Sequence, residues 1–415
     1  MQLQAPSGLM GLPNELKSSI TSFLSDSDLA ILCHLMFGSY IHLILDSSRN
    51  QATIAVLNSL TPKRLVEFRL SGFLDVNCFG ELVIKQNCLE HLSFRHCWHY
   101  FSPTFAETPT FPSLKTLSLY NVHLTDAVPP EGENSIGLIV QNAPKLACLQ
   151  YTCPRAQRRQ NLLEGVLRYR NKGSIHSQLR LQSLMLHGQD LSLETLLVAI
   201  ISGVDFSWIR TLYLRRCPFA SKFLATVSRE NNLLLKTFVF VQHVDDTLPH
   251  STLPAFLRSF SGLEHMCIDL NENQPLPAIE DFENHAGTLV TLIVGHNRNF
   301  VSPAYSLPEI AHLCESLRQL QRLAVHCPVL EYPTNLNGDL IPQAGMTEFL
   351  KSVATLPSLK TLRITNLLNI GPKVRSFVDV PDFGLCLDQY VNTLESLATQ
   401  CFRYLVQIQK TSKVD

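Results

Sequence analysis

A six-residue pattern recurs along this chain: an apolar residue, two variable residues, an apolar residue, one variable residue and a third apolar residue. Leu114-Lys-Thr-Leu117-Ser-Leu119 is a clear copy. Steps between the second apolar residues of successive copies range from 24 residues (Phe68 to Leu92) to 39 (Leu323 to Leu362). The second apolar residues of the eleven copies are Phe68, Leu92, Leu117, Leu149, Leu184, Leu212, Phe238, Met266, Leu292, Leu323 and Leu362.

The alternation inside each copy predicts a short β-strand. Leu117 and Leu119 point to one side of such a strand and Ser118 to the other. Because one short strand cannot bury its apolar side alone, we expect successive copies to stack into one continuous parallel sheet with a shared core. Apolar residues at helical spacing predict helices over residues 193–201 and 347–354, between the strands.

The repeats resemble those of irregular leucine-rich-repeat proteins, in which Cys or Asn follows the strand. Cys97 and Cys217 occupy that position, three residues after Phe94 and Leu214. The resemblance implies an α/β fold, a leucine-rich-repeat solenoid with a curved parallel β-sheet and outer helices. We expect the solenoid to span residues 41–375 and a helical cap to follow over residues 376–415.

Composition favours a folded chain inside the cell. The sequence is 45% hydrophobic and 17% charged, and its 34 basic and 35 acidic residues give a net charge of -1. That balance gives no reason to expect a nucleic acid or an anionic membrane as partner. The start of the chain lacks the pattern of a secretory signal, and the twelve cysteines are scattered, so we expect a cytoplasmic or nuclear protein with reduced thiols.

Residues 9–40 follow a different, helical pattern. Pro13 suits the first turn of a helix, and Leu16, Ile20 and Phe23 then lie on one face of it. Asp26 can cap a second helix, which begins near Asp28. The segment resembles the F-box, whose pattern is Leu-Pro-x-Glu-Leu, a few helical apolar residues, and then Asp-Leu-x-x-Leu. The matching residues are Leu12, Pro13, Glu15, Leu16, Ile20, Phe23, Leu24, Asp28, Leu29 and Leu32.

An F-box followed by leucine-rich repeats is typical of substrate receptors of SCF cullin–RING ubiquitin ligases. The resemblance implies that these residues bind the SCF adaptor protein and that the repeats bind a protein target. The chain departs from the pattern, because residues 40–45 are strand-like where a full F-box continues with another helix; the module is shortened by around a dozen residues. The alternative is a helical cap over the end of the repeat core.

Motifs for catalysis and cofactors are not found. The sequence has no glycine-rich phosphate loop, no Gly-x-Ser-x-Gly and no His-Glu-x-x-His, so we expect no enzyme and no cofactor. The densest group of potential metal ligands is Cys88, His91, His96, Cys97 and His99. Its spacing fits no closed zinc site, so we expect no metal. Cys148 and Cys153 read as residues of the fourth repeat rather than as a redox pair.

The residue after each copy of the pattern predicts a row across the open side of the sheet. This row is Ser71, Arg95, Tyr120, Thr152, His187, Arg215, Val241, Asp269, Gly295, His326 and Thr365. Arg, Tyr and His are favoured at protein interfaces. We therefore nominate Arg95, Tyr120, His187 and Arg215, with Tyr213 from the adjacent row, as target-binding residues; ordinary solvated polar residues are the alternative.

Two functions remain open. The first is a non-catalytic substrate-recognition subunit of an SCF-type ligase, which binds the adaptor through the F-box and a target through the repeats. The second is a leucine-rich-repeat interaction scaffold without a ubiquitin role, in which the N-terminal helices serve only as a cap.

Overall fold

The computed structural model describes the repeat region in most detail. The described residues are 41–46, 65–71, 86–95, 98–99, 110–124, 135–153, 163–167, 178–229, 233–244, 249, 251–271, 274–296, 304–326, 331–332, 344–365, 369–370, 395, 398, 399, 402, 403 and 406. The chain forms two compact units, Met1–Ile209 (unit 1) and Arg210–Asp415 (unit 2). The F-box-like residues from Leu12 to Leu32, and Cys97, lie outside the described residues.

Unit 1 is built on a run of parallel strands paired in the order β1-β2-β3-β5-β7-β8. Two short strands, β4 and β6, form a separate parallel pair beyond β3 and β5. The strands are β1 (Ile41–Asp46), β2 (Leu65–Ser71), β3 (His91–Arg95), β4 (Trp98–His99), β5 (Thr116–Tyr120), β6 (His123–Leu124), β7 (Cys148–Thr152) and β8 (Ser183–His187). The described helices of unit 1 include α5 (Ser135–Gln141), α7 (Glu194–Gly203) and the short 3-10 helix η1 (Phe206–Trp208).

Unit 2 repeats the same plan, with parallel strands in the order β9-β10-β11-β12-β13-β15 and a short pair β14-β16. Its strands are β9 (Thr211–Arg215), β10 (Thr237–Val241), β11 (His265–Leu270), β12 (Thr291–His296), β13 (Arg322–Val325), β14 (Glu331–Tyr332), β15 (Thr361–Ile364) and β16 (Asn369–Ile370). Its helices are α8 (Ala220–Val227), α9 (Thr252–Arg258), η2 (Ile279–His285), α10 (Leu307–Ser316) and α11 (Ala344–Ala354).

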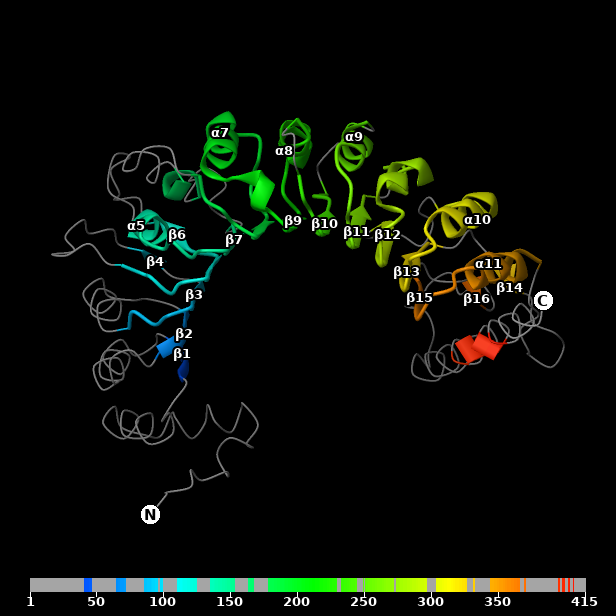
Figure 1. The fold of residues 1–415 in the computed structure, drawn as a ribbon, viewed down its shortest axis with the longest axis horizontal. Coiled ribbons are helices and arrows are strands. Elements are labelled where there is room, and N and C mark those ends of the chain that lie inside the picture. The colour runs from blue at the N-terminus through cyan, green and yellow to red at the C-terminus, as the bar shows by residue number, and fades with distance from the viewer. Residues whose placement is uncertain are drawn as a thin grey trace, which may run out of the picture. The chain divides into compact units, whose positions relative to one another are not determined.

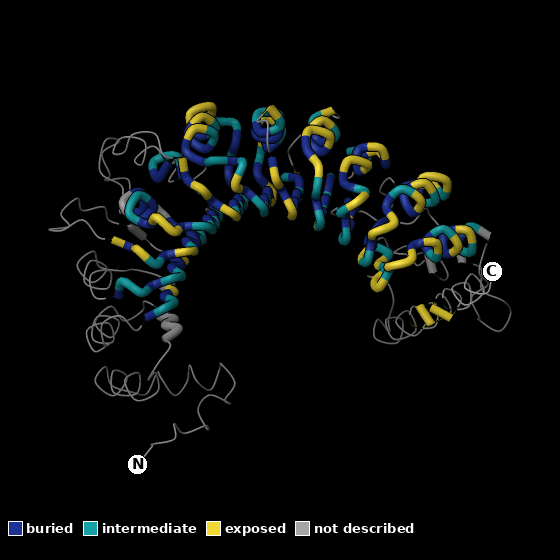
Figure 2. Tube along the Cα trace, in the orientation of Figure 1, coloured by how far each residue is buried: buried dark blue, intermediate teal, exposed yellow. Residues whose placement is uncertain are grey.

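In unit 2, the helices between the strands all lie on one side of the sheet (Figure 1). The core lies between the layer of helices and the layer of strands. The sides of the helices that face the strands are buried, and the opposite sides are exposed (Figure 2). Leu212 and Leu214 of β9, for example, are fully buried, while Tyr213 between them is half-exposed. We call the side of each sheet away from the core its open face.

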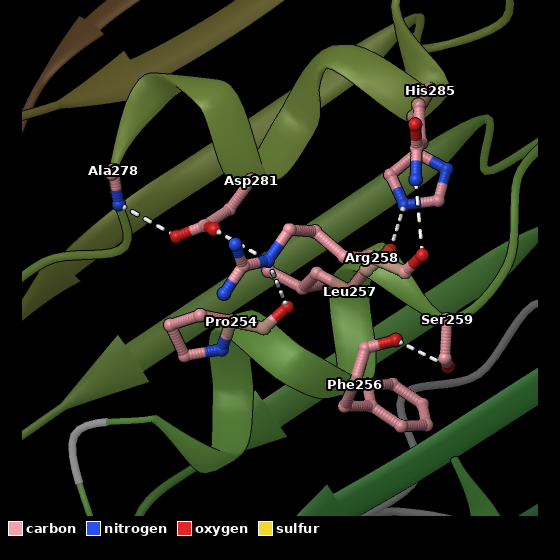
Figure 3. A network of polar contacts seen from close by, with 9 residues as sticks. Pro254, Phe256, Leu257, Arg258, Ser259, Ala278, Asp281 and His285 are labelled. Atoms are coloured by element: carbon pink, nitrogen blue, oxygen red, sulfur yellow. Dashed lines mark hydrogen bonds and ion pairs between the residues drawn. The ribbon is translucent and has the colours of Figure 1, made fainter. Parts of the chain in front are cut away.

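Hydrogen bonds between helix ends and loops hold neighbouring repeats of unit 2 together. The His285 ring is fully buried, and its Nε2 donates to the Leu257 carbonyl at 3.0 Å (Figure 3). Its Nδ1 accepts the Leu263 amide at 3.4 Å. Beside it, Asp281 accepts the Ala278 amide and lies 3.3 Å from Arg258 Nε (Figure 3). One repeat thus supplies the partners for polar groups of the next, as buried groups require.

The structure confirms the predicted repeat class. Each of the eleven copies forms a strand of one of these two runs, every pairing between them is parallel, and Leu117, Leu184, Leu212 and Leu292 are buried. The predicted helices at 193–201 and 347–354 are α7 and α11. The chain is therefore an α/β leucine-rich-repeat solenoid.

The two ends of the repeat region differ from each other. Residues 41–46, which the sequence predicts to be strand-like and to begin the solenoid, form the parallel strand β1; its Leu43 is paired with Phe68, so the strand run of unit 1 begins one strand before the first copy. In β15, by contrast, Leu362 is only half-buried. Residues 376–415 fall almost wholly outside the described residues; the few that are described are helical, and Phe402 is exposed. None of the described helices has the length and apolar character needed to cross a membrane.

Candidate protein-binding surfaces

The open face of unit 1 carries the first part of the predicted row in one register. Ser71 is paired with Arg95, Arg95 with Tyr120, Tyr120 with Thr152, and Thr152 with His187. Hydrogen bonding continues past the strand ends, because the Asn121 amide donates to the Thr152 carbonyl at 2.9 Å. The strands therefore stay extended through these positions and present the row on the side opposite to the buried anchors.

Two of these side chains, Arg95 and Tyr120, are held in place by their neighbours. The Arg95 guanidinium lies 4.9 Å from the centre of the Tyr120 ring, within the range of a cation–π contact. The Tyr120 hydroxyl donates to Gln150 Oε1 at 2.6 Å, and the Ser118 hydroxyl donates to the same oxygen at 3.0 Å. Arg95 is exposed and Tyr120 is half-exposed, so the group is both ordered and open to a partner.

The open face of unit 2 carries the second part of the row. Arg215 is paired with Val241, Val241 with Asp269, and Asp269 with Gly295. Arg215 is exposed, and Tyr213 in the adjacent row is half-exposed. Since the nominated residues are divided between two units, Arg95, Tyr120 and His187 form one local group, and Tyr213 and Arg215 form another.

Asp269 has an unusual environment for a residue of an open face. Burial raises the pKa of its carboxyl group to about 6, although the charges of Arg216 and Arg215 act in the opposite direction. Burial also raises the pKa of the half-buried Cys267 thiol on the same strand, and the Asp269 charge adds to that effect. A thiol with a raised pKa is a poor nucleophile, so Cys267 does not resemble a catalytic cysteine.

His326 is placed differently from the prediction that it contributes to an open row. Its ring is buried and lies over Gly295, where an added Cβ would come within 2.8 Å of the ring atoms Cε1 and Nδ1. His326 Nδ1 is hydrogen-bonded to Thr365 Oγ1 at 3.0 Å, and the ring meets that of His296 edge-on at 5.6 Å. At this end of the row the His326 ring covers β12, because Gly295 has no side chain and leaves room for the ring.

The position that follows each strand has a structural role that the sequence only partly indicated. Cys217 is buried there, as the repeat pattern predicts. Asn271 occupies the same position three residues after Ile268, and its Nδ2 donates to the carbonyls of His243 (2.6 Å) and Val244 (3.2 Å) of the preceding repeat. Asn271 was not predicted from the sequence, although its spacing from the strand was a sufficient signal.

The group of Cys and His residues between Cys88 and His99, at which no metal was expected, lies only partly within the described residues. His96 and Cys97 lie outside the described residues, and among the described ones no three His, Cys, Asp or Glu side chains gather closely enough to hold a metal ion. Cys148 and Cys153 are not joined in a disulfide, and Cys153 is buried.

Comparisons with known proteins add little at the level of sequence. No family model matches the chain, and no curated protein matches it. Among solved structures, the chain is similar to the leucine-rich repeat-containing protein LegL7 from Legionella pneumophila, with 13% sequence identity and a TM-score of 0.41. That match covers 87% of this chain and 98% of LegL7.

Proposed function

We propose that this chain is a non-catalytic scaffold that binds another protein on the open faces of its repeats. The observation that carries the proposal is the ordered group on unit 1, in which Arg95 lies over Tyr120 and Gln150 holds the Tyr120 hydroxyl. Arginine and tyrosine dominate the binding energy of many interfaces. Side chains that are already ordered lose less entropy when a partner binds.

The chemistry of the described titratable groups supports a binding role rather than a catalytic one. Burial raises the pKa of the Cys148 thiol on the open face of unit 1, as it does for Cys267 on unit 2. Raised pKa values keep both thiols protonated at neutral pH and so disfavour nucleophilic attack.

The test compares two arginine–aromatic pairs of unit 1 in the full chain. We expect Arg95→Ala with Tyr120→Ala to reduce the partners captured by cross-linking in the native cell at least tenfold. Arg180→Ala with Trp208→Ala is the matched control, because Arg180 lies 5.2 Å from the Trp208 ring but neither residue belongs to the open-face rows. Equal capture by the two double variants would reject the proposed surface.

We further propose that the partner is a ubiquitination target and that the chain is the substrate receptor of an SCF-type ligase. This proposal depends on the resemblance of the N-terminal segment to the F-box, whose residues are not among those described. A helix with Leu16 and Ile20 on one face would offer the apolar surface that docking to an adaptor requires. Thr21, between Ile20 and Phe23 in the sequence, lies off that face and provides a control position.

The SCF adaptor protein itself is the probe for this second step. We expect the purified full chain to bind the adaptor, and Leu16→Asp with Ile20→Asp to abolish binding, while Thr21→Ala binds normally. The far-UV circular dichroism spectra and the melting temperatures of the three full-length proteins should be the same, which would show that the repeats stay folded. No adaptor binding by the unmodified chain would leave the scaffold without a ligase role, with the N-terminal helices acting as a cap.

A further inference from the structure

An apolar strip crosses the open face of unit 2. Tyr213, Val239, Cys267, Ile293 and Ala324 occupy the same position on five neighbouring strands, each paired in register with the next. Ile293, with 37% of its surface exposed, is among the exposed large hydrophobic residues of the chain. Ala324, at the far end of the strip, is buried (4% exposed), and the five positions, on strands about 4.8 Å apart, span roughly 19 Å.

Exposed arginines stand at both ends of this strip. Beside Tyr213 they come from the end of β9, and beside Ala324 they come from β13 and β15. None of them forms an ion pair with a carboxylate among the described residues, whereas elsewhere in unit 2 Lys236 pairs with Glu264 at 2.9 Å. The four arginines are Arg215, Arg216, Arg322 and Arg363.

Backbone geometry brings two of these guanidinium groups to one end. Arg216 has a φ of 51°, in the left-handed region, so the in-and-out alternation of β9 stops there. Arg215 occupies an outward-facing position of β9, Arg216 follows it directly, and the charges of both lower the pKa of Asp269, two strands away. Asp269 is the one acidic residue among the described open-face positions of β9 to β15, so the face carries excess positive charge.

We propose that the open face of unit 2 binds an extended segment of a partner protein that is apolar at its centre and carries Asp or Glu side chains at both ends. This inference rests on the proposed scaffold function and names the chemistry of the partner. An extended chain advances about 3.3 Å per residue, so about six residues cover the strip. The acidic residues at its ends then meet the exposed arginines, which form strong charge-assisted hydrogen bonds with carboxylates.

Asp269 limits the affinity of this surface for an acidic segment. Its carboxylate lies in the row next to the strip, in register with Val241 and Gly295, and shares the field of the two arginines at one end. A ligand carboxylate that approaches Arg215 or Arg216 is repelled by it. Removing that one negative charge should therefore tighten binding, whereas removing the arginines should weaken it.

The test presents a displayed library of random eight-residue peptides to the full chain. We expect enrichment of peptides with an apolar centre and acidic residues at both ends. Synthetic peptides from the enriched set should bind at least tenfold more weakly to Arg215→Ala with Arg363→Ala, and at least tenfold more weakly to Ile293→Asp. They should bind several-fold more tightly to Asp269→Asn.

Two control variants keep charge and exposure matched. Arg229→Ala removes an exposed arginine that follows α8, and Val198→Asp replaces an exposed apolar residue (59%) on α7 of unit 1. Both should bind the peptides normally, and the melting temperatures of all variants should agree to within a few degrees, because every changed side chain is at least partly exposed. Enrichment of basic peptides, a requirement for phosphate, or equal binding by Ile293→Asp would overturn the inference.

Failure of this inference is distinguishable from failure of the proposed function. If only the inference is wrong, capture in cells still depends on Arg95 and Tyr120 of unit 1 while the peptides ignore the unit 2 variants. If the scaffold function is wrong, neither the unit 1 double variant nor the unit 2 variants change what the chain captures.

Discussion

The open faces of unit 1 and unit 2 use the same strand positions for different chemistry. In unit 1 the middle position of the strands carries polar groups such as Ser118 and Gln150, which are hydrogen-bonded to one another. In unit 2 the same position carries Val239, Cys267 and Ile293, whose side chains present mainly apolar surface. Because these positions make no contribution to the core, one scaffold can present a polar, pre-ordered surface and an apolar one bordered by charge.

The largest expected effect is a loss of stability in the core beneath the open face of unit 2. Leu212→Asp places an unpaired charge in the fully buried anchor position of β9, so we expect a loss of about 4 kcal/mol or more of unfolding free energy. Tyr213→Asp, one residue further along the same strand, should cost only about 1 kcal/mol, because that side chain faces outward. Urea unfolding measures both, and similar losses for the two variants would contradict the assigned faces.

Acid should distinguish the two units next. The buried histidines of the described residues, His285, His296 and His326, all belong to unit 2. Burial lowers the pKa of His285 to about 4. The neutral ring accepts the Leu263 amide at Nδ1, and protonation of Nδ1 would set two N–H groups against each other. The unfolded chain, with a histidine pKa of about 6.5, takes up a proton first, so stability present above pH 6.5 is lost as the pH falls toward 4.

That loss amounts to about 3 kcal/mol for His285 alone. We expect urea midpoints to fall across this pH range, and hydrogen exchange, corrected for intrinsic rates, to locate the loss of protection in unit 2. His285→Gln should flatten the pH dependence. A loss of protection that begins in unit 1 would run against this assignment.

A smaller effect is expected where unit 2 closes its row. Gly295→Ala would push a methyl group against the His326 ring, which is buried and hydrogen-bonded to Thr365, so we expect a loss of about 1–2 kcal/mol. Gly287→Ala is the control, since nothing lies within 4 Å of its added Cβ. Thermal unfolding of the two variants should separate them by several degrees; equal melting temperatures would mean that the ring moves aside freely.

The smallest effect concerns the ordering of the unit 1 face. Tyr120→Phe removes the hydroxyl that donates to Gln150, and a loss of about 1 kcal/mol or less is expected. Tyr213→Phe should change stability by only a few tenths of a kcal/mol, because among the described residues the Tyr213 hydroxyl has no hydrogen-bond partner. If Tyr213→Phe costs as much as Tyr120→Phe, the contrast between an ordered polar face and an apolar one is not supported.

The sequence was sufficient to predict the repeat and much of the row. Anchors such as Leu117 and Leu292 carry a period-two signal that only burial on one side of a strand explains, and the structure places them in the core. The register that joins Arg95 to Tyr120 follows from the same alternation. Each of these features is local, so each copy contains the information needed to place its own residues.

Features that depend on contacts between copies could not be predicted in this way. No single copy indicates that the His326 ring would fold over Gly295, because the two residues belong to different repeats and meet only after the strands are paired. The raised pKa of Asp269 also has its origin in burial and in arginines two strands away. The sequence predicted a strand at residues 40–45, but its pairing with β2 could not be predicted from the repeat, because Ile41–Asp46 lacks the full six-residue pattern.

The alternation within the strands also determines where this chain can change its length during evolution. Inserting one residue between Leu212 and Leu214 would turn every following side chain of β9 to the opposite face. Leu214 would then be exposed and Arg215 would be buried. An insertion between strands shifts nothing beyond its own loop, and the spacing of 24 to 39 residues between copies shows that such insertions have been accepted. Lineages of this protein should therefore differ in loop length while every strand keeps its residue count.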